Sequence, residues 1–280
     1  MENGKLFVVA TPIGNLDDTS KRSLKTLNDV DLIAAEDTRK TRHLLSHFNI
    51  KARMISLHEH NEEGIAKKLI EDIKNGNSVA LVSDAGTPAI NDPGYRLILQ
   101  AHKQNIIVVP LPGPCSIISA LSVSGLPSDR FCFEGYLPAK SESRKSKLKE
   151  LEKEERTLIF LISVHKISQS LEDMLLIFGG DRITFIAREM TKIYEQCIRA
   201  KLGELLKMIA GGEIPKKGEF VLIIEGCKEN NDDSLVLARD LMSELINNNL
   251  SSQAVDIVTK VTKIKRNIIY KMMLGLKKEQ

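Results

Sequence analysis

Short apolar runs alternate with longer segments of helical periodicity along the first half of the chain. Five runs rich in Val, Ile, Leu and Ala have the length and composition of buried strands: 6–9, 32–35, 54–57, 79–82 and 106–109. Strands that alternate with helices are typical of a mostly parallel sheet, because each parallel connection needs a crossover. We therefore expect a first α/β domain over residues 1–130.

The same alternation resumes in the second half of the chain. The expected strands are 157–162, 183–187, 197–200 and 220–224, with helices near 166–177 and 201–210. This pattern predicts a second α/β domain over 131–227, with antiparallel pairing in places. Helical periodicity is lost around 131–138 and the charged segment 140–156 follows, so this stretch is the best linker candidate.

The last part of the chain, 228–280, has a different character. Residues 235–246 are apolar at helical spacing, and Ser251 or Ser252 can cap a helix that runs through Val258. A last helix over 263–273 places Ile264, Ile268, Ile269 and Met272 on one face. Two short helices with a tight turn resemble a helix-turn-helix. The expected fold is thus α/β, with two domains that each hold a sheet flanked by helices, plus a small C-terminal helical appendage.

Composition narrows the class of protein. A length of 280 residues fits about two domains, and the four cysteines are scattered without a C-x-x-C pair, which gives no zinc ribbon or redox motif. No run of eighteen apolar residues and no signal-peptide pattern occur, so we expect a soluble cytoplasmic protein. The net charge of +3 is too small for a histone-like binder, so any RNA contact would come from local basic patches.

Three compact loops rich in Gly and Pro follow expected strands. They are 10–17 (ATPIGNLD), 83–94 (SDAGTPAINDPG) and 110–116 (PLPGPCS). Open α/β sheets bind ligands at the carboxyl ends of their strands. Gly86 allows close approach of a ligand, and Pro88 and Pro93 restrict the loop conformation, although connecting turns use the same residues. The loops match neither G-x-G-x-x-G nor the G-x-x-x-x-G-K-[ST] phosphate loop, so a nicotinamide cofactor or a nucleoside triphosphate is not indicated.

These loops, in this order, resemble the tetrapyrrole methylase superfamily, whose members bind S-adenosylmethionine between two α/β domains. Within it, the chain resembles the family of 16S rRNA ribose methyltransferases that methylate the 2'-hydroxyl of a cytidine in the decoding region. The segments that carry the resemblance span nearly the whole chain: 10–16, 35–39 (AEDTR), 58–61 (HEHN), 83–94, 111–114, 124–127, 134–138 (EGYLP), 188–192 (REMTK) and 217–219 (KGE).

The resemblance implies S-adenosylmethionine as methyl donor and a set of cofactor-binding residues in the first domain. These are Ile13, Gly14, Asp84, Ala85, Gly86, Thr87, Cys115 and Ser116, with Leu161, Ala187, Glu225 and Gly226 as weaker candidates from the second domain. The Asp84 carboxylate would pair with the positively charged amino or sulfonium end of the cofactor. The chain departs from the family in two places: 160–166 reads FLISVHK where the family has FYESPHR, and Asn91 replaces a serine.

The implied reaction is attack of a ribose oxygen on an activated methyl group, in which alignment dominates. A base near the hydroxyl or a cation near the oxyanion would help, and the candidates are Glu36, Asp37, Arg39 and Lys192. Glu36, Asp37 and Arg39 have a structural alternative as a surface ion pair at a helix start, where Asp37 or Thr38 is a plausible N-cap.

The expected RNA-contacting residues lie in three places. They are His58, His60 and Asn61; Arg188 and Glu189; and Lys263, Lys265 and Arg266 in a basic tail that also holds Lys260, Lys271, Lys277 and Lys278 against one carboxylate, Glu279. The tail is either an RNA-backbone patch or a solvated helix face. His43 and His47 are four residues apart but lack a third ligand, and no metal is expected.

Three functions stay open at this point. The favoured one is an rRNA ribose methyltransferase that acts on 16S rRNA in the small ribosomal subunit, as a homodimer by the habit of the superfamily. A tetrapyrrole methyltransferase would share the loops, but the AEDTR and REMTK segments and the basic tail argue against it. A non-catalytic ribosome-binding factor would have no need of three preorganised loops. Cofactor titration separates the third function from the first two.

Overall fold

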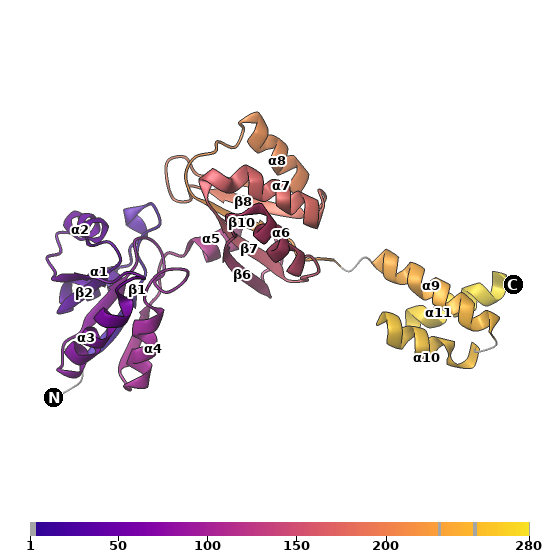
Figure 1. The fold of residues 1–280 in the computed structure, drawn as a ribbon, viewed down its shortest axis with the longest axis horizontal. Coiled ribbons are helices and arrows are strands. Elements are labelled where there is room, and N and C mark those ends of the chain that lie inside the picture. Colours follow the sequence, from indigo (N-terminus) through magenta and orange to yellow (C-terminus); the bar gives the residue numbers. More distant parts are fainter. Residues whose placement is uncertain (1–3, 229–230, 249–250, 280) are drawn as a thin grey trace. The chain divides into compact units, whose positions relative to one another are not determined.

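The computed structural model describes residues 4–228, 231–248 and 251–279, with the backbone alone at 231–234, 251–252 and 277–279. It divides into two compact units, Met1–Glu225 and Gly226–Gln280, and each unit is described here by itself (Figure 1). The predicted limits 1–130, 131–227 and 228–280 stay predictions.

The first sheet holds five strands in the order β3-β2-β4-β1-β5, and every pair is parallel. Its strands are β1 (Lys5–Val9), β2 (Leu32–Ala35), β3 (Met54–Ser56), β4 (Val79–Val82) and β5 (Ile107–Leu111). All five coincide with the predicted apolar runs to within two residues. Because the strands are parallel, their carboxyl ends lie along one edge of the sheet.

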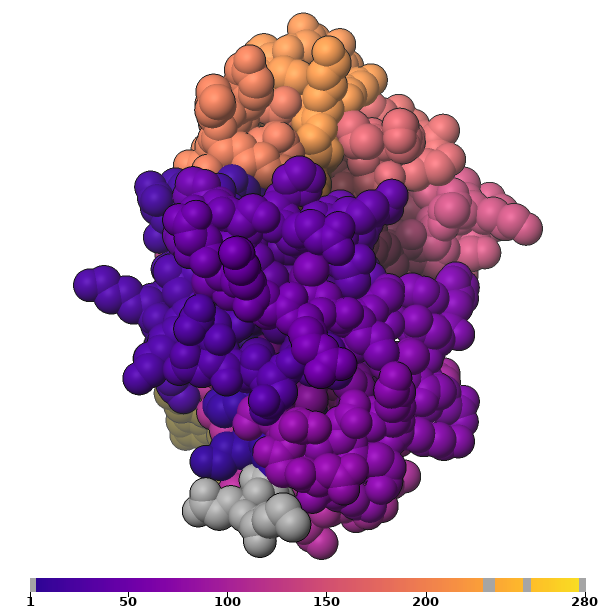
Figure 2. All heavy atoms as spheres, turned by 90° about the vertical axis from the view of Figure 1, so that its left-hand side faces the viewer, coloured from indigo at the N-terminus to yellow at the C-terminus, as the bar shows by residue number. Residues whose placement is uncertain are grey.

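Helices cover both faces of this sheet. One face packs against α1 (Lys21–Asp29) and α2 (Thr38–His47), and the other against α3 (Glu62–Lys74) and α4 (Tyr95–Lys103). A short 3-10 turn, Leu16–Asp18, lies in the loop after β1. Atoms of this domain, coloured indigo to purple, form the face turned to the viewer in Figure 2. Ser20 and Asp37 accept backbone N–H bonds at the starts of α1 and α2, so both helices begin at an N-cap.

The second sheet is mixed, in the order β6-β7-β10-β8-β9. Its strands are β6 (Phe131–Tyr136), β7 (Thr157–Ile162), β8 (Ile183–Arg188), β9 (Gln196–Lys201) and β10 (Phe220–Ile224). β10 runs antiparallel to both β7 and β8, which confirms the expected antiparallel pairing. One face is covered by α6 (Ser141–Glu150), α7 (Ile167–Phe178) and α8 (Leu202–Gly211), and the 3-10 turn Val164–Lys166 precedes α7.

The other face of the second sheet packs against α5 (Ser116–Val123), which directly follows the last strand of the first sheet. Ile117, Ala120 and Leu121 of α5 are buried against strand residues that include Ile159 and Val221. The loop 110–116 therefore connects β5, an edge strand of the first sheet, to α5, a helix that packs on the second sheet. This connection fixes where residues of the second sheet lie relative to the three loops.

The expectation of a linker over 131–138 and 140–156 is wrong. Residues 131–136 form β6, and most of the charged segment forms α6. α6 buries only Arg144 and Leu148, so its sequence is as polar as a solvated linker. The Arg144 guanidinium forms an ion pair of 2.6 Å with Asp173 on α7, and this buried pair replaces the apolar contacts that a helical pattern would show.

The second unit consists of α9 (Asn231–Asn247), α10 (Ser251–Thr262) and α11 (Arg266–Glu279). Its core holds Met242, Val258 and Ile269 among other apolar side chains, whereas Ile268 is 43% exposed. The expected cap at Ser251 or Ser252 and the side chains of Lys277, Lys278 and Glu279 lie outside the described residues. Within the part of the chain that the structure describes, no helix is both long and apolar enough to cross a membrane.

Candidate functional site

The three predicted loops interlock at the carboxyl edge of the first sheet. Thr11 and Gly86 exchange two backbone hydrogen bonds of 2.9 Å each, and the Thr11 hydroxyl donates to the Ser83 carbonyl at 3.1 Å. The Thr87 hydroxyl donates to the Pro114 carbonyl, also at 3.1 Å. These contacts tie loop 83–94 to both other loops, so the three form one continuous surface.

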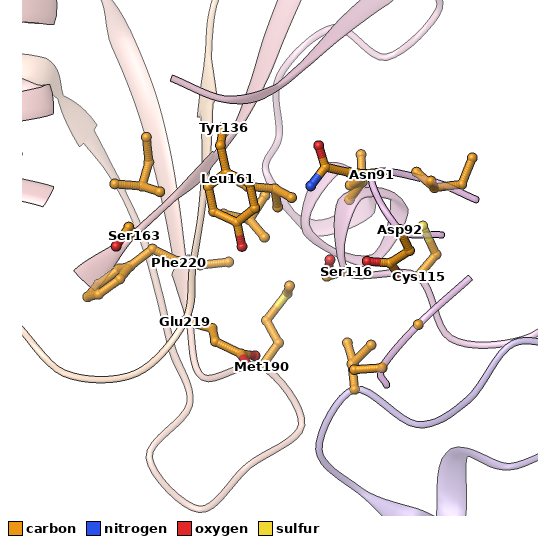
Figure 3. Close-up of a pocket in the computed structure, with 18 of the residues that line it drawn as sticks. Asn91, Asp92, Cys115, Ser116, Tyr136, Leu161, Ser163, Met190, Glu219 and Phe220 are labelled. Carbon is orange, nitrogen blue, oxygen red and sulfur yellow. The ribbon is translucent and has the colours of Figure 1, made fainter. Parts of the chain in front are cut away.

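A cavity of about 520 Å³ opens beside this surface, between the loops and the second sheet (Figure 3). Eight of the predicted cofactor residues line it: Ile13, Ala85, Gly86, Thr87, Cys115 and Ser116 from the first domain, and Leu161 and Ala187 from the second. Its volume lies in the range of pockets that hold small molecules and cofactors. The sequence-based candidates thus converge on one cavity.

The far wall of the cavity comes from the second sheet, at the end where β7 and β8 stop and β10 starts, and apart from Leu161 and Ala187 sequence reasoning missed it. Phe220, the first residue of β10, pairs with Ile162 at the end of β7 and Arg188 at the end of β8. This wall includes Tyr136, Met190, Gly218, Glu219, Phe220 and Val221. A signal was available, because the EGYLP and KGE segments were among those that carry the family resemblance.

Gly14 and Asp84 do not line this cavity. A Cβ atom on Gly14 would lie 2.5 Å from the Lys192 Cγ and 2.7 Å from the Thr191 Oγ1 atom, and the neighbouring Asn15 N–H donates to that hydroxyl at 3.0 Å. Glycine at this position therefore allows contact with the loop that follows β8. The Asp84 carboxylate accepts the Asp37 N–H at 2.9 Å and the Lys40 ammonium at 2.7 Å. Both assignments to the cofactor stay predictions.

The candidates at the end of β2 form the structural arrangement that was their alternative. Asp37 is the N-cap of α2, and its carboxylate binds the Arg39 guanidinium at 2.7 Å and 3.1 Å. That hydrogen-bonded guanidinium holds the pKa of Asp37 well below its usual range. Glu36 accepts the Asp84 N–H at 3.1 Å. The Arg39 side chain is 84% exposed, so it remains accessible to a phosphate.

The REMTK segment folds into a tight loop after β8. Arg188 is buried, and its guanidinium donates to the carbonyls of Lys217 and Tyr194 at 2.7 Å and 2.9 Å, so it holds the loop instead of facing solvent. The Lys192 ammonium binds Glu189 at 2.9 Å and Glu219 at 3.1 Å. Burial lowers the pKa of Lys192, but these two hydrogen bonds outweigh it and the pKa lies above its usual value.

The predicted RNA contacts lie outside the cavity lining. Asn61 accepts the His58 N–H at 2.9 Å and donates to the Ser56 carbonyl at 3.1 Å, which closes the turn before α3. The rings of His58 and His60 meet edge to face at 6.0 Å, and His60 is exposed. In the second unit Lys263, Lys265 and Arg266 are exposed, and Arg266 pairs with Asp256 at 2.9 Å.

Two carboxylates, Asp92 and Glu219, face the cavity from opposite walls (Figure 3). The phenol of Tyr136 lies near both: its pKa is raised by burial first and then by the negative charges of Glu219 and Asp92. Among the described residues, no group of three or more His, Cys, Asp or Glu side chains could hold a metal ion. The cavity therefore combines small uncharged residues with two acidic groups.

Comparison with known proteins identifies a matching family model and relatives of high sequence identity. The model of the Tetrapyrrole (Corrin/Porphyrin) Methylases matches residues 5–206. The chain is 48% identical over 271 residues to "Ribosomal RNA small subunit methyltransferase I" of Escherichia coli O157:H7, which covers 97% of this chain and 95% of that protein. The protein of the same name from Vibrio cholerae serotype O1 is 47% identical and covers 95% of this chain and 93% of its own length.

Solved structures share the fold at low sequence identity. Diphthine synthase has a TM-score of 0.60 at 15% identity and covers 79% of this chain and 90% of its own. A uroporphyrin-III C-methyltransferase from Thermus thermophilus, complexed with S-adenosylhomocysteine, has a TM-score of 0.54 at 16% identity, over 79% of this chain and 97% of its own. The chain belongs to the tetrapyrrole methylase family, and within it to the group of relatives named ribosomal RNA small subunit methyltransferase I.

Proposed function

We propose that this protein transfers a methyl group from S-adenosylmethionine to the ribose 2'-oxygen of a cytidine in the decoding region of 16S rRNA. The observation that carries the proposal is the cavity of about 520 Å³, built from the loops that the family resemblance assigns to the cofactor. Near full-length identity of 47–48% to the rRNA methyltransferases of two bacteria supports RNA as the substrate class.

The cavity fits S-adenosylmethionine in size and in donor set. Ala85, Gly86 and Gly218 leave room for a ligand to approach the backbone, and a positive φ of 81° at Gly86 suits glycine. The Glu219 carboxylate on the cavity wall supplies negative charge for a cation. When bound, the cofactor supplies a methyl group activated by its sulfonium charge.

The protein's own contribution is alignment of the ribose hydroxyl with that methyl group. Holding reacting atoms about 3 to 3.5 Å apart supplies several kcal/mol of the barrier. We assign Lys192 to the rim of the cavity, where Glu219 holds its ammonium, and Arg39 to a phosphate of the RNA. Glu36 and Asp37 would act by holding the Asp84 and Arg39 groups in place.

We also propose that the exposed cations of the second unit bind the RNA backbone. Replacing both Lys263 and Lys265 by alanine should weaken rRNA binding equally for all sequences. It should also lower the slope of log affinity against log salt by about two, one for each lost phosphate contact. Filter binding over a salt series measures this slope. An unchanged slope would leave the basic tail as a solvated helix face.

The test of the function is methyl transfer from labelled S-adenosylmethionine to small ribosomal subunits that lack the modification, with naked 16S rRNA and a tetrapyrrole in parallel. We expect label in a 2'-O-methylcytidine of the decoding region. Label in the tetrapyrrole alone would favour the family's other chemistry. Tight cofactor binding without transfer to any acceptor would contradict the proposed substrate.

We propose a homodimer as the functional assembly, following the habit of the superfamily. Static light scattering at working concentration distinguishes a homodimer from a monomer, since a single chain has a mass of 31.2 kDa. A monomer that retains full methyl transfer would contradict this assembly and leave the proposed reaction intact.

A further inference from the structure

Asp92 is an acidic side chain on the cavity wall to which the sequence assigns no role. It lies in the loop between β4 and α4, and its carboxylate points into the cavity beside Ser116 and Cys115 (Figure 3). Of the two carboxylates that line the cavity, Glu219 is already bound to the Lys192 ammonium. Asp92 forms no ion pair among the residues that the structure describes, so it is available to a ligand.

The backbone around Asp92 is held in a defined conformation. Ala89 and Asn91 have left-handed φ values of 66° and 63°, which cost on the order of 1 kcal/mol each unless the surroundings impose them. Here the Ala89 N–H donates to the Pro93 carbonyl at 3.3 Å, and Glu62 accepts the Gly94 N–H at 3.1 Å. The backbone on either side of Asp92 is therefore held by contacts within the protein.

Across the cavity, β6 leaves room for this loop. A Cβ on Gly135 would lie 3.0 Å from the Asn91 Oδ1 atom, so the Asn91 amide would have to shift by a few tenths of an ångström, and the left-handed φ of 66° also suits glycine. The bulge in β6 between Phe133 and Gly135 brings Tyr136 to the cavity wall. Both domains therefore fix the space into which Asp92 points.

Burial and neighbouring negative charges make the Asp92 carboxylate a stronger base than that of an ordinary aspartate. Burial first, and then the negative charges of Glu36 and Asp84, raise the pKa of Asp92 to about 6, although a hydrogen bond from Ser83 opposes this. The Lys40 ammonium binds one of these two carboxylates, Asp84, at 2.7 Å. From the second domain the Tyr136 phenol lines the same cavity, and burial first, then the charges of Glu219 and Asp92, raise the pKa of that phenol.

We propose that Asp92 is the general base that accepts the proton of the attacking ribose hydroxyl, an inference that rests on the proposed function. The ribose oxygen forms the new O–C bond as the bond between methyl and sulfur breaks, and the electron pair of that bond stays on sulfur. The hydroxyl proton passes to the Asp92 carboxylate and then to water. A base whose pKa lies near the working pH is both ionised and able to take a proton, which is the condition for efficient general base catalysis.

The first test is Asp92→Asn, which keeps the size of the side chain but cannot accept the proton. Single-turnover methyl transfer to the rRNA substrate should fall by about 100-fold or more. Cofactor affinity measured by calorimetry should stay within about twofold of wild type, because the loss concerns the transition state. Asp181→Asn is the matched control: that carboxylate is 93% exposed and pairs with Lys201, and the rate should not change.

The second test is the pH dependence, which a merely structural role would not produce. Below the pKa the carboxyl is protonated, so the wild-type rate should fall about tenfold per pH unit on the acid side of one inflection. This inflection should lie at or below about pH 6, because the cationic cofactor favours the ionised carboxylate, and the residual rate of Asp92→Asn should lack it. Carbon-13 NMR of aspartate-labelled protein without ligand should show one carboxyl that titrates near pH 6 and is absent from Asp92→Asn.

Three results would overturn the assignment: an unchanged rate in Asp92→Asn, a loss confined to cofactor affinity, or an acid inflection in the rate that is the same in wild type and in Asp92→Asn. If Asp92→Asn does not fold, as judged by circular dichroism, the wild-type rate profile and carboxyl titration decide. Mapping the methylated atom keeps the two proposals apart. A methyl on a base contradicts the proposed function, whereas a 2'-O-methyl made at full rate by Asp92→Asn contradicts only the role of Asp92.

Discussion

The two sheets supply their halves of the cavity in different ways. The first sheet is wholly parallel, and its half consists of loops that follow β1, β4 and β5. The second sheet is mixed, and its half consists of residues at or just after the ends of β6, β7 and β8 and at or just before the start of β10. In a parallel sheet one edge collects only strand ends, whereas an antiparallel strand brings its beginning to the same edge.

This difference determines where functional residues can be recognised in a sequence. The three loops of the first sheet are visible because each follows an apolar run and is rich in Gly and Pro. The residues before β10, such as Gly218 and Glu219, precede their strand, so a search of strand ends passes over them. In a mixed sheet both ends of every strand have to be searched.

The largest expected effect concerns the buried ion pair between α6 and α7. These two helices cover one face of the second sheet, which forms the second half of the cavity. Arg144→Met should lower the free energy of unfolding by about 3 to 5 kcal/mol, because it leaves the buried Asp173 carboxylate without its guanidinium. Chemical denaturation measures the change. Lys145→Met is the matched control: it lies 3.9 Å from the same carboxylate on the more exposed side, and should cost less than about 1 kcal/mol. Equal losses would show that the buried pair is not the support.

A smaller effect tests the anchor of the first half. The buried carboxylate of Glu62 accepts the N–H groups of Gly94 and Arg96 at 3.1 Å and 2.7 Å, at the start of α4. Glu62→Gln removes the charge at this helix start and should cost about 1 to 2 kcal/mol in thermal unfolding. Glu63→Gln changes an exposed neighbour whose only described ion pair is with Arg96 at 3.5 Å, and should cost less than about 0.5 kcal/mol. A loss from Glu63→Gln as large as from Glu62→Gln would contradict the anchor.

The smallest effect concerns the segment before β10. Gly218 and Gly212 have similar left-handed φ values of 90° and 84°, but only at Gly218 would a Cβ collide with a neighbour, the Glu189 side chain. Both alanine variants should lower the free energy of unfolding, because alanine is strained at a left-handed φ. Gly218→Ala should cost about 1 kcal/mol more and weaken cofactor binding in calorimetry, because Glu189 holds Lys192. Equal cofactor affinity in the two variants would show that the Gly218 position does not contribute to cofactor binding.

Much of the fold could be predicted from the sequence, for a physical reason. β4 and β10 are buried at every residue, so their sequences are continuously apolar and easily recognised. β6 was missed because it is only half-buried and a bulge at Gly135 interrupts its alternation. α6 was missed because an ion pair, and not an apolar stripe, attaches it to α7.

The candidate site shows the same limit. Gly86 and Ser116 were recognised because their loops carry the family segments, and both line the cavity. Asp92 stands in the same loop as Gly86, but its proposed role depends on burial in the folded cavity and on the charge of Glu36, which lies at the end of another strand, β2. The chemistry of a carboxylate is set by charges that are distant in the sequence, and a linear pattern does not contain their distances.

The reciprocal hydrogen bonds between Thr11 and Gly86 bear on how this protein can be redesigned. Each residue is donor and acceptor to the other, so a change in either loop that moves the backbone of Thr11 or Gly86 weakens both bonds together. A chimera with a relative of different substrate choice would have to carry 10–17 and 83–94 together. For loop exchange the two segments therefore act as one structural unit, although 65 residues of chain separate them.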